Sequence, residues 1–305
     1  MKDATKNYSK FLGTENAETA VHGYLYLTYI LHYLNKMAGP MGLVSKPPES
    51  DIPPEAEEAI EILTHRVARE SMSAETSTYH GKIVRLRHAE DLIMVEEDIE
   101  LRDMEKVIPY KVARDIIIRH PQKIALFDCP CRLLQAEPCE PIHVCMAVGD
   151  PVASFIVEHG LMNAEFVTSE KAVQVLREEH ECGHVHGAYF KDIAGDRFFA
   201  ICNCCSCCCF GIQAWNRFKT PIIASAGYVA RINEECTSCG ECEDICPFGA
   251  ISLEGPAAVD EEVCMGCGVC ESACEFSAIE LELDPSKSGP LDIKRLVKEQ
   301  SEGKQ

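Results

Sequence analysis

Eight cysteines between residues 228 and 283 form two copies of one pattern, C-x2-C-x2-C-x3-C. The first copy is Cys236, Cys239, Cys242 and Cys246, and the second, 28 positions later, is Cys264, Cys267, Cys270 and Cys274. Ala250 and Ile251 recur in the same register as Ala278 and Ile279. Matched cysteines in register indicate an internal repeat. This repeat constrains the fold strongly, because thiols at such spacing are expected to converge on a bound group.

The spacing also predicts which cysteines converge. Two-residue gaps let a turning loop wrap three thiolates around one cubane iron–sulfur cluster, while the fourth thiolate points away and binds the neighbouring cluster. One cluster is therefore expected on Cys236, Cys239, Cys242 and Cys274, and a second on Cys246, Cys264, Cys267 and Cys270. Two four-cysteine zinc sites are the alternative, which is less favoured because zinc sites usually combine separate C-x2-C pairs across long spacers.

With these motifs, residues 228–283 resemble a bacterial-type ferredoxin domain with two 4Fe-4S clusters, and a proline follows Cys246 as it does in that family. The resemblance covers less than a fifth of the chain. It implies a small βαββαβ unit with pseudo-two-fold symmetry, whose clusters pass single electrons at low potential. Glu275 stands where the family usually has proline. We expect its negative charge to lower the potential of the first cluster.

The ferredoxin-like segment is strongly acidic. It carries 13 acidic residues and one basic residue, Arg231, for a net charge of −12, and the whole 305-residue chain has a net charge of −20. Such a surface favours a redox partner protein with a basic docking patch, although a solvated acidic face without a partner is the plainer interpretation. The overall charge argues against nucleic acid and anionic membranes, which attract clusters of Lys and Arg.

Eleven further cysteines lie in residues 126–227, and ten of them fall into two groups. The first group is Cys129, Cys131, Cys139 and Cys145, and the second is Cys202, Cys204, Cys205, Cys207, Cys208 and Cys209. The second group is too crowded for all six thiols to meet one metal, so only a subset of the ten is expected to bind. One or two further iron–sulfur clusters are favoured, with zinc or metal-free thiols as alternatives. The pattern resembles a domain of unassigned function that is joined to ferredoxin modules in anaerobes.

Three histidines and an arginine accompany these cysteines. His184 and His186 alternate on a predicted strand before the second group, where either could act as a ligand or a proton donor. Local hydrogen bonding is the commoner role for such histidines, and the same choice applies to His143. Arg132 directly follows Cys131 and either neutralises a cluster charge or lies at the surface.

The total of 19 cysteines is odd, and the start of the chain has no export signal. Both features predict a reducing cytoplasm, where dense cysteines serve as metal ligands or redox groups rather than disulfides. The longest apolar run, residues 24–34, has about 11 residues, whereas a transmembrane helix needs roughly 20. We expect no membrane span, and a buried helix at a domain or subunit contact instead.

The sequence predicts an α+β fold of four regions. Residues 1–125 are expected to be mostly helical, residues 126–227 a mixed cysteine-rich domain, residues 228–283 the ferredoxin domain, and residues 284–305 a polar, mobile tail. Helices are expected at residues 20–37, 55–70, 110–119 and 169–181 and from about residue 211, and strands at residues 82–87, 124–127, 184–189 and 197–202.

Together these features predict an iron–sulfur electron-transfer protein of an anaerobe. It would relay single low-potential electrons to or from further clusters in the cysteine-rich domain or a partner oxidoreductase, as a subunit of a larger complex. Two other classes stay open: a reductase with a catalytic cluster in the cysteine-rich domain, and a zinc-stabilised redox-sensing or binding module. The chain has no dinucleotide fingerprint, P-loop or c-type haem motif, which favours an electron carrier or oxidoreductase subunit over a stand-alone enzyme.

Overall fold

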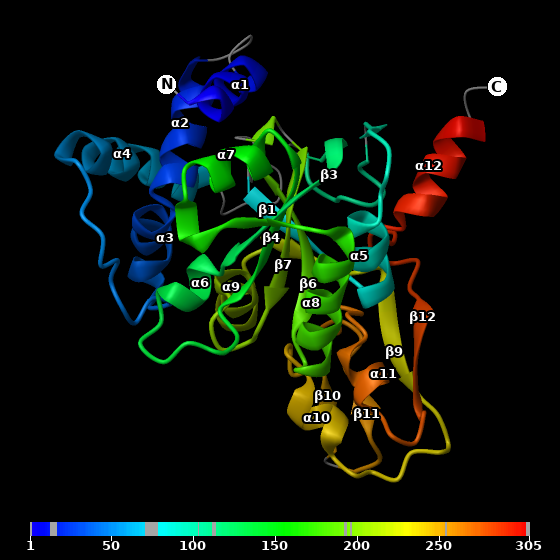
Figure 1. The fold of residues 1–305 in the computed structure, drawn as a ribbon. Helices are drawn as coiled ribbons and strands as arrows, with labels where there is room; N and C mark the ends of the chain where they lie inside the picture. The colour runs from blue at the N-terminus through cyan, green and yellow to red at the C-terminus, as the bar shows by residue number, and fades with distance from the viewer. Residues whose placement is uncertain are drawn as a thin grey trace.

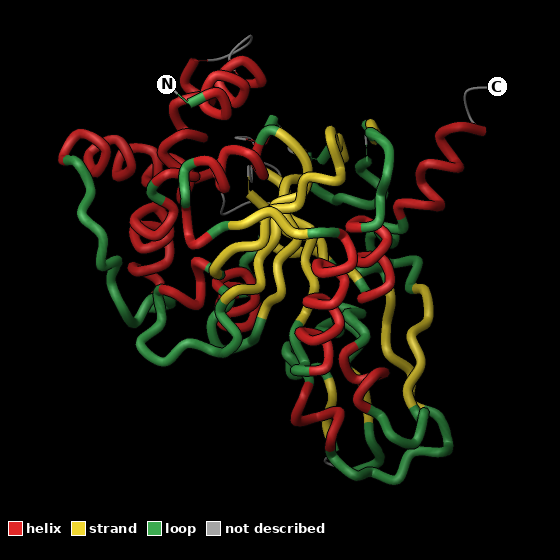
Figure 2. Tube along the Cα trace, in the orientation of Figure 1, coloured by secondary structure: helices red, strands yellow, loops and turns green. Residues whose placement is uncertain are grey.

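The computed structural model describes residues 2–12, 17–70, 79–102, 104–111, 114–191, 194–195, 197–253 and 255–302. It is 40% helix and 23% strand, a mixed composition consistent with the predicted α+β class. Figure 1 shows a twisted central sheet, a group of amino-terminal helices beside it, and the ferredoxin-like segment below it. Strands form the middle of the molecule, with helices around them (Figure 2).

The central sheet has eight strands in the order β2-β3-β4-β7-β6-β1-β8, with β5 paired to β3. The strands are β1 (Tyr79–Val84), β2 (Ile99–Leu101), β3 (Ile116–Asp128), β4 (His143–Asp150), β5 (Glu165–Val167), β6 (Val185–Lys191), β7 (Arg197–Cys204) and β8 (Ile223–Ala224). The β1–β8 pair is parallel, and the other pairs are antiparallel. The β6 and β7 strands correspond to the two strands predicted at residues 184–189 and 197–202.

The sheet crosses the boundary that was predicted between residues 125 and 126, because that boundary falls inside β3. Strand β1, from the region predicted to be mostly helical, pairs with β6 along its whole length. The helix predicted over residues 110–119 is wrong, since residues 116–118 begin β3. These are three consecutive isoleucines, whose β-branched side chains fit a pleated sheet better than a helix. Both regions therefore contribute to one hydrophobic core.

The helices outside the ferredoxin-like segment are α1 (Asp3–Leu12), α2 (Ala17–Thr28), α3 (Ile30–Ala38), α4 (Pro54–Glu70), α5 (Leu86–Ile93), α6 (Pro130–Leu133), α7 (Val152–Glu158), α8 (Ser169–Glu181), α9 (Phe210–Phe218) and α12 (Ile293–Glu302), with 3-10 turns η1 (Gly39–Met41) and η2 (Leu161–Asn163). The helices predicted at residues 55–70 and 169–181 are confirmed. The helix predicted at residues 20–37 is two helices, because Tyr29 has non-helical dihedrals between α2 and α3.

The apolar run of residues 24–34 packs within the chain itself. Leu25, Tyr26, Leu27 and Tyr33 are buried in the main hydrophobic core. Among the described residues, no helix is both long and apolar enough to cross a lipid bilayer.

The ferredoxin-like segment has the βαββαβ element order that the resemblance implies. Its elements are β9 (Tyr228–Ile232), α10 (Glu241–Ile245), β10 (Ile251–Ser252), β11 (Ala258–Val259), α11 (Val269–Ala273) and β12 (Ile279–Leu283). Strand β9 pairs with β12, and β10 pairs with β11. Helix α11 contacts α8, which joins this segment to the central sheet.

The carboxyl-terminal residues differ from the predicted polar, mobile tail. Leu291, Ile293 and Leu296 are buried, and the last two lie one turn apart on α12. Ser288 accepts a hydrogen bond of 2.8 Å from the buried Lys82 Nζ in β1. The prediction was wrong because a few apolar side chains on one helical face are enough to anchor an otherwise polar helix.

Candidate metal centres

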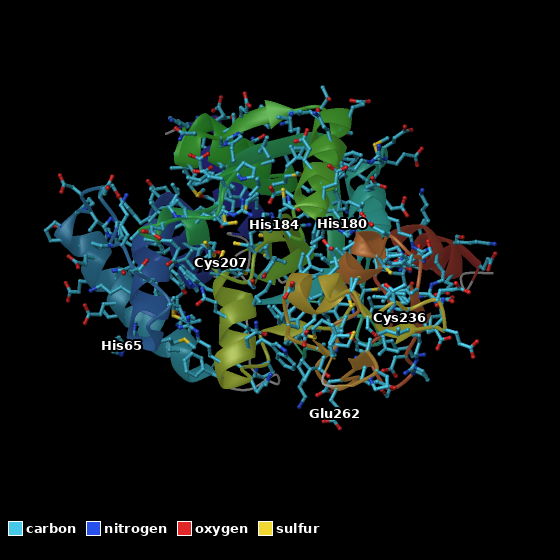
Figure 3. The ribbon with its side chains drawn as sticks, turned by 90° about the horizontal axis from the view of Figure 1, so that it is seen from below. His65, His180, His184, Cys207, Cys236 and Glu262 are labelled. Atoms are coloured by element: carbon cyan, nitrogen blue, oxygen red, sulfur yellow. The ribbon has the colours of Figure 1, made fainter. Side chains whose placement is uncertain are left out.

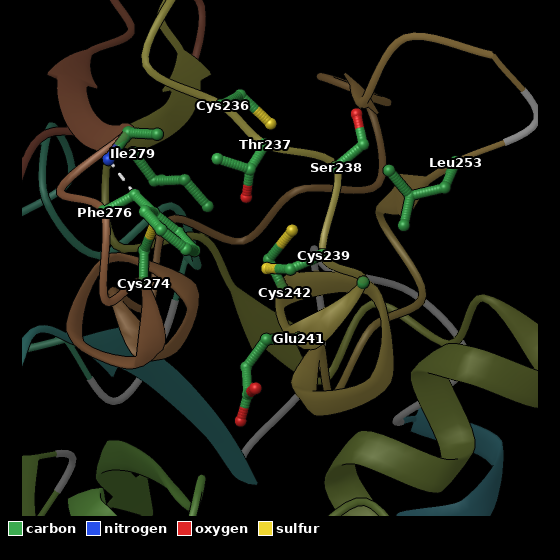
Figure 4. Close-up of a pocket in the computed structure, with 12 residues that line it drawn as sticks. Cys236, Thr237, Ser238, Cys239, Glu241, Cys242, Leu253, Cys274, Phe276 and Ile279 are labelled. Atoms are coloured by element: carbon green, nitrogen blue, oxygen red, sulfur yellow. Dashed lines mark hydrogen bonds between the residues drawn. The ribbon is translucent and has the colours of Figure 1, made fainter.

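The first cavity of the ferredoxin-like segment is lined by four cysteines from both repeats (Figure 4). Three of them, Cys236, Cys239 and Cys242, come from the loop before α10 and from that helix, and Cys274 comes from the end of α11. This is the set expected for the first cluster from spacing alone. Soft thiols that converge on one cavity from two repeats fit a cubane cluster.

The second cavity is lined by Cys246, Cys264, Cys267 and Cys270. The structure thus brings together the set expected for the second cluster as well. The two crossing cysteines have matched surroundings: the Ala250 amide donates a 3.3 Å hydrogen bond to Cys246 Sγ, and the Ala278 amide donates one of the same length to Cys274 Sγ. The recurrent alanines of the repeat therefore supply amide donors to sulfur.

The two cavities differ in exposure. In the first, Cys239 is exposed and Phe276 at the rim is 46% exposed, whereas three of the four cysteines of the second cavity are buried. Burial raises the pKa of the Cys267 thiol to about 12, since thiolate is disfavoured away from water unless a cation balances it. The cysteines of the second cavity are the more buried set, and these thiol donors suit a group that carries positive iron.

A close backbone approach explains one glycine of the second loop. Gly266 has φ +64, and a Cβ at this position would overlap the carbonyl of Tyr228. A side chain here is therefore excluded twice, by the left-handed dihedral and by the space. The contact holds the cysteine loop against β9.

The ten middle cysteines form two groups, which differ from the two groups in the sequence. Six of them make a closed ring in which each thiol shifts the pKa of its two neighbours. In order around the ring they are Cys129, Cys131, Cys209, Cys204, Cys202 and Cys145. We call this set the six-cysteine ring. Its members come from the start of α6, from β4 and β7, and from the start of α9.

The ring is enclosed by protein. Hydrogen bonds from Cys131 lower the pKa of Cys129 and Cys209, while that from Cys129 raises the pKa of Cys131. The hydroxyl of Tyr189 lies 3.8 Å from Cys204 Sγ and 3.9 Å from Cys209 Sγ. The six thiols therefore share charge within one buried network, which is the soft donor set that iron–sulfur clusters use.

The other group consists of Cys139, Cys205, Cys207 and Cys208. The Sγ atoms of the first three all lie within 4.8 Å of one another. Cys208 Sγ lies 3.6 Å from Cys207 Sγ and accepts a hydrogen bond from the Cys139 amide. Cys139 was expected beside Cys129 on the basis of spacing, but it lies in the loop between α6 and β4, which carries it to the turn that follows β7.

A buried charged chain lies beside both groups. Arg132, which is fully buried rather than at the surface, forms a 2.8 Å ion pair with Glu179, also buried. Glu179 Oε2 lies 2.8 Å from His184 Nδ1, and His184 Nε2 lies 3.4 Å from Cys139 Sγ. Glu179 was not predicted from the sequence, because it belongs to no motif. Only the fold brings this residue of α8 next to His184.

His186 has a different surrounding from His184. Its Nδ1 lies 2.7 Å from Asn203 Oδ1, and its ring stacks on that of His180 with centroids 5.4 Å apart. His180 Nε2 in turn lies 2.7 Å from Ser272 Oγ on α11. Burial lowers the pKa of His186 to about 3, so this imidazole is neutral at ordinary pH. Sequence reasoning missed His180, Asn203 and Ser272, since none has a motif.

His143 has the local role that was the commoner expectation. Its Nδ1 pairs with Asp128 Oδ1 at 2.6 Å, and its Nε2 lies 3.8 Å from Glu165.

Comparison with known families adds to this geometry. The 4Fe-4S binding domain family matches residues 229–252 and 257–280, one match in each repeat. Comparisons with curated proteins and with solved structures gave no match. Residues 229–280 are a ferredoxin-like segment with two 4Fe-4S binding motifs, joined to a cysteine-rich region.

Proposed function

We propose that this chain transfers electrons between its ferredoxin-like segment and a further iron–sulfur cluster bound by the six-cysteine ring. The two 4Fe-4S motifs indicate iron–sulfur electron transfer. The observation that carries the extension to the ring is its closed set of six interacting thiols, buried beside the strands of the central sheet. When bound, the clusters supply the one-electron chemistry, and the protein supplies position, burial and hydrogen bonds.

In the ferredoxin-like segment, the proposed ligands are the cysteines that line each cavity. Cys236, Cys239, Cys242 and Cys274 would bind the first cluster, and Cys246, Cys264, Cys267 and Cys270 the second. The amide hydrogen bonds to Cys246 and Cys274 would favour the reduced form, because they stabilise negative charge on sulfur.

A continuous set of contacts supports transfer between the two regions. Ser272 belongs to α11 and hydrogen-bonds to His180 on α8, which stacks on His186 in β6. His186 hydrogen-bonds to Asn203, which lies between two ring cysteines in β7. In Figure 3, His180 is seen between Cys236 and His184. The last step runs through the backbone of β7, because Asn203 adjoins Cys202 and Cys204 in the strand.

The exposure of the two cavities supports an order in which electrons would pass through the molecule. The first cavity, with exposed Cys239 and Phe276, would exchange electrons with a partner protein. The second, more buried cavity would face the six-cysteine ring. The net charge of −12 on residues 228–283 favours a partner with a basic surface.

The 19 cysteines are odd in number and dense, which suits metal ligands in a reducing compartment, and we place the protein in the cytoplasm of an anaerobe. Its natural setting is an oxidoreductase complex.

The test of the ring compares two serine variants of the full chain, purified without oxygen. Cys209→Ser removes a ring thiol, and Cys182→Ser removes an exposed thiol outside both groups. We expect Cys209→Ser to lose about four iron atoms per chain, one cubane equivalent, while the EPR signals of the reduced ferredoxin-like segment persist. Cys182→Ser should keep all its iron. Equal iron contents in the two variants would refute a cluster at the ring.

A further inference from the structure

The second sulfur group is separate from the six-cysteine ring and has a geometry of its own. Cys139 comes from the loop before β4, while Cys205 and Cys207 come from the turn between β7 and α9. Their Sγ atoms lie within 4.8 Å of one another. Cys205 is buried, Cys139 is half-buried and Cys207 is exposed, so the group lies near the surface (Figure 3).

The spacing of these sulfur atoms suits one metal ion rather than a cluster. Around a tetrahedral zinc ion with Zn–S bonds of about 2.3 Å, neighbouring sulfur atoms lie about 3.8 Å apart. The thiolates of a cubane each bind a different iron, so the cluster lies between them and holds them further apart. Three sulfur atoms within 4.8 Å of one another therefore favour a mononuclear site.

His184 lies beside one sulfur atom of this group, although its ring nitrogens are not within 4.8 Å of all three. Its Nε2 lies 3.4 Å from Cys139 Sγ, and nitrogen and sulfur ligands of one tetrahedral zinc ion are expected about 3.5 Å apart. Its Nδ1 lies 2.8 Å from Glu179 Oε2. A histidine that binds metal through one nitrogen usually donates the other N–H to a carboxylate, which fixes the ring and makes it a better ligand.

The supporting carboxylate is itself held firmly. Glu179 is 1% exposed and Arg132 is 0% exposed, and they form a 2.8 Å ion pair. Arg132 also donates hydrogen bonds to the carbonyl oxygens of Pro141 and Asn203. The chain from Arg132 through Glu179 to His184 thus orients the imidazole toward Cys139. Cys208, which touches Cys207, is the competing fourth donor.

We propose that Cys139, Cys205, Cys207 and His184 bind one divalent ion of the zinc class, distinct from the iron of the ring. With all four positions filled by protein, this site is structural. It ties the loop before β4 to the turn after β7, which carry cysteines of both groups. No electron passes through it, because zinc has no redox chemistry in proteins.

The test measures zinc, iron and zinc-edge X-ray absorption on the full chain, purified without oxygen. We expect about one zinc ion per chain, with three sulfur ligands and one nitrogen ligand. Cys207→Ser should lose the zinc and keep the iron, whereas the neighbouring Cys208→Ser should keep both. His184→Cys should retain zinc with four sulfur ligands, and Glu179→Gln should weaken zinc binding about 10- to 100-fold. The EPR signals of the ferredoxin-like segment report folding in every variant.

Four results would overturn the proposal: wild type without zinc, zinc with four sulfur ligands in wild type, zinc lost from Cys208→Ser but not from Cys207→Ser, or iron lost from Cys207→Ser. These results differ from those that would refute the proposed electron transfer between the ferredoxin-like segment and the six-cysteine ring. A chain with zinc here and no iron at the ring would keep this site and refute the ring cluster, and a chain with the reverse contents would do the opposite.

Discussion

Single buried side chains set the electrostatic environment of both middle sulfur groups. Arg132 is buried beside Glu179, and its charge acts on Cys129 of the ring and on Cys205 of the second group. Burial lowers the pKa of Arg132, but the negative charges of Glu179 and these thiols raise it further, so the guanidinium stays charged. A buried ion pair adds little net stability. Its consequence here is a fixed positive charge beside two groups of cysteines.

Lys82 is another buried cation, and it gives a prediction about pH. It lies in β1, donates to Ser288 Oγ, and burial lowers its pKa from 10.5 to about 7. Between these values the unfolded chain binds more protons than the folded chain, so stability rises with pH from about 7 toward about 10. We expect Lys82→Met to remove this contribution. The measurement is the difference in urea unfolding midpoint between variant and wild type across this pH range, and a difference that does not change with pH would contradict the assignment.

At the scale of elements, helices α8 and α11 join the ferredoxin-like segment to the sheet, and His180 is at their contact. We expect His180→Phe, which keeps a ring but loses the hydrogen bond to Ser272, to slow electron exchange between the two regions without changing the iron content. His143→Gln, remote from this contact, is the matched control. Rapid reduction of the segment followed by freeze-quench EPR measures the rate. An unchanged rate in His180→Phe would exclude this route.

Helix α12 gives a stability prediction because one of its faces is buried. Ile293 is 1% exposed, whereas Val297 on the same helix is 40% exposed. Truncation of a buried isoleucine costs about 2–5 kcal/mol, so Ile293→Ala should lower the anaerobic urea midpoint clearly, and Val297→Ala should change it little. Similar small shifts in both variants would mean that the carboxyl-terminal residues are a mobile tail after all.

The elements also show what the sequence could and could not predict. The cysteine repeat predicted both ferredoxin cavities, because its ligands lie within local loops of fixed spacing. The 169–181 helix was predicted because Thr168 caps it locally. The pairing of β1 with β6 could not be predicted, since long-range strand pairing leaves no local signal. The position of Cys139 beside Cys205 depends on that sheet, and so does the placement of Glu179 under His184.

In the whole molecule, the acidic charge and the more exposed cysteine cavity lie at the same end. The strongly acidic ferredoxin-like segment lies at one end (Figure 1), and its more exposed cavity is lined by Cys239 and Phe276. The contact between α8 and α11 joins this end to the sheet. This arrangement suits a path from a partner protein into the interior.

The acidic end predicts salt-sensitive partner binding. If a basic redox partner docks on residues 228–283, the second-order rate of electron exchange should fall as ionic strength rises. Salt screens attraction between charges that are further apart than the Debye length, which is about 8 Å at physiological salt. Stopped-flow reduction by a basic carrier and by an acidic one gives a matched comparison. A rate with the basic carrier that is independent of salt would argue against electrostatic docking.

The iron and acid-labile sulfide content of the full chain, purified without oxygen, and EPR of its dithionite-reduced form together show whether the six-cysteine ring binds a cluster. A cluster at the six-cysteine ring in addition to the two of the ferredoxin-like segment predicts about twelve or more iron atoms per chain and signals from more than two clusters. About eight iron atoms, with signals from two clusters only, would contradict the account and confine electron transfer to the ferredoxin-like segment.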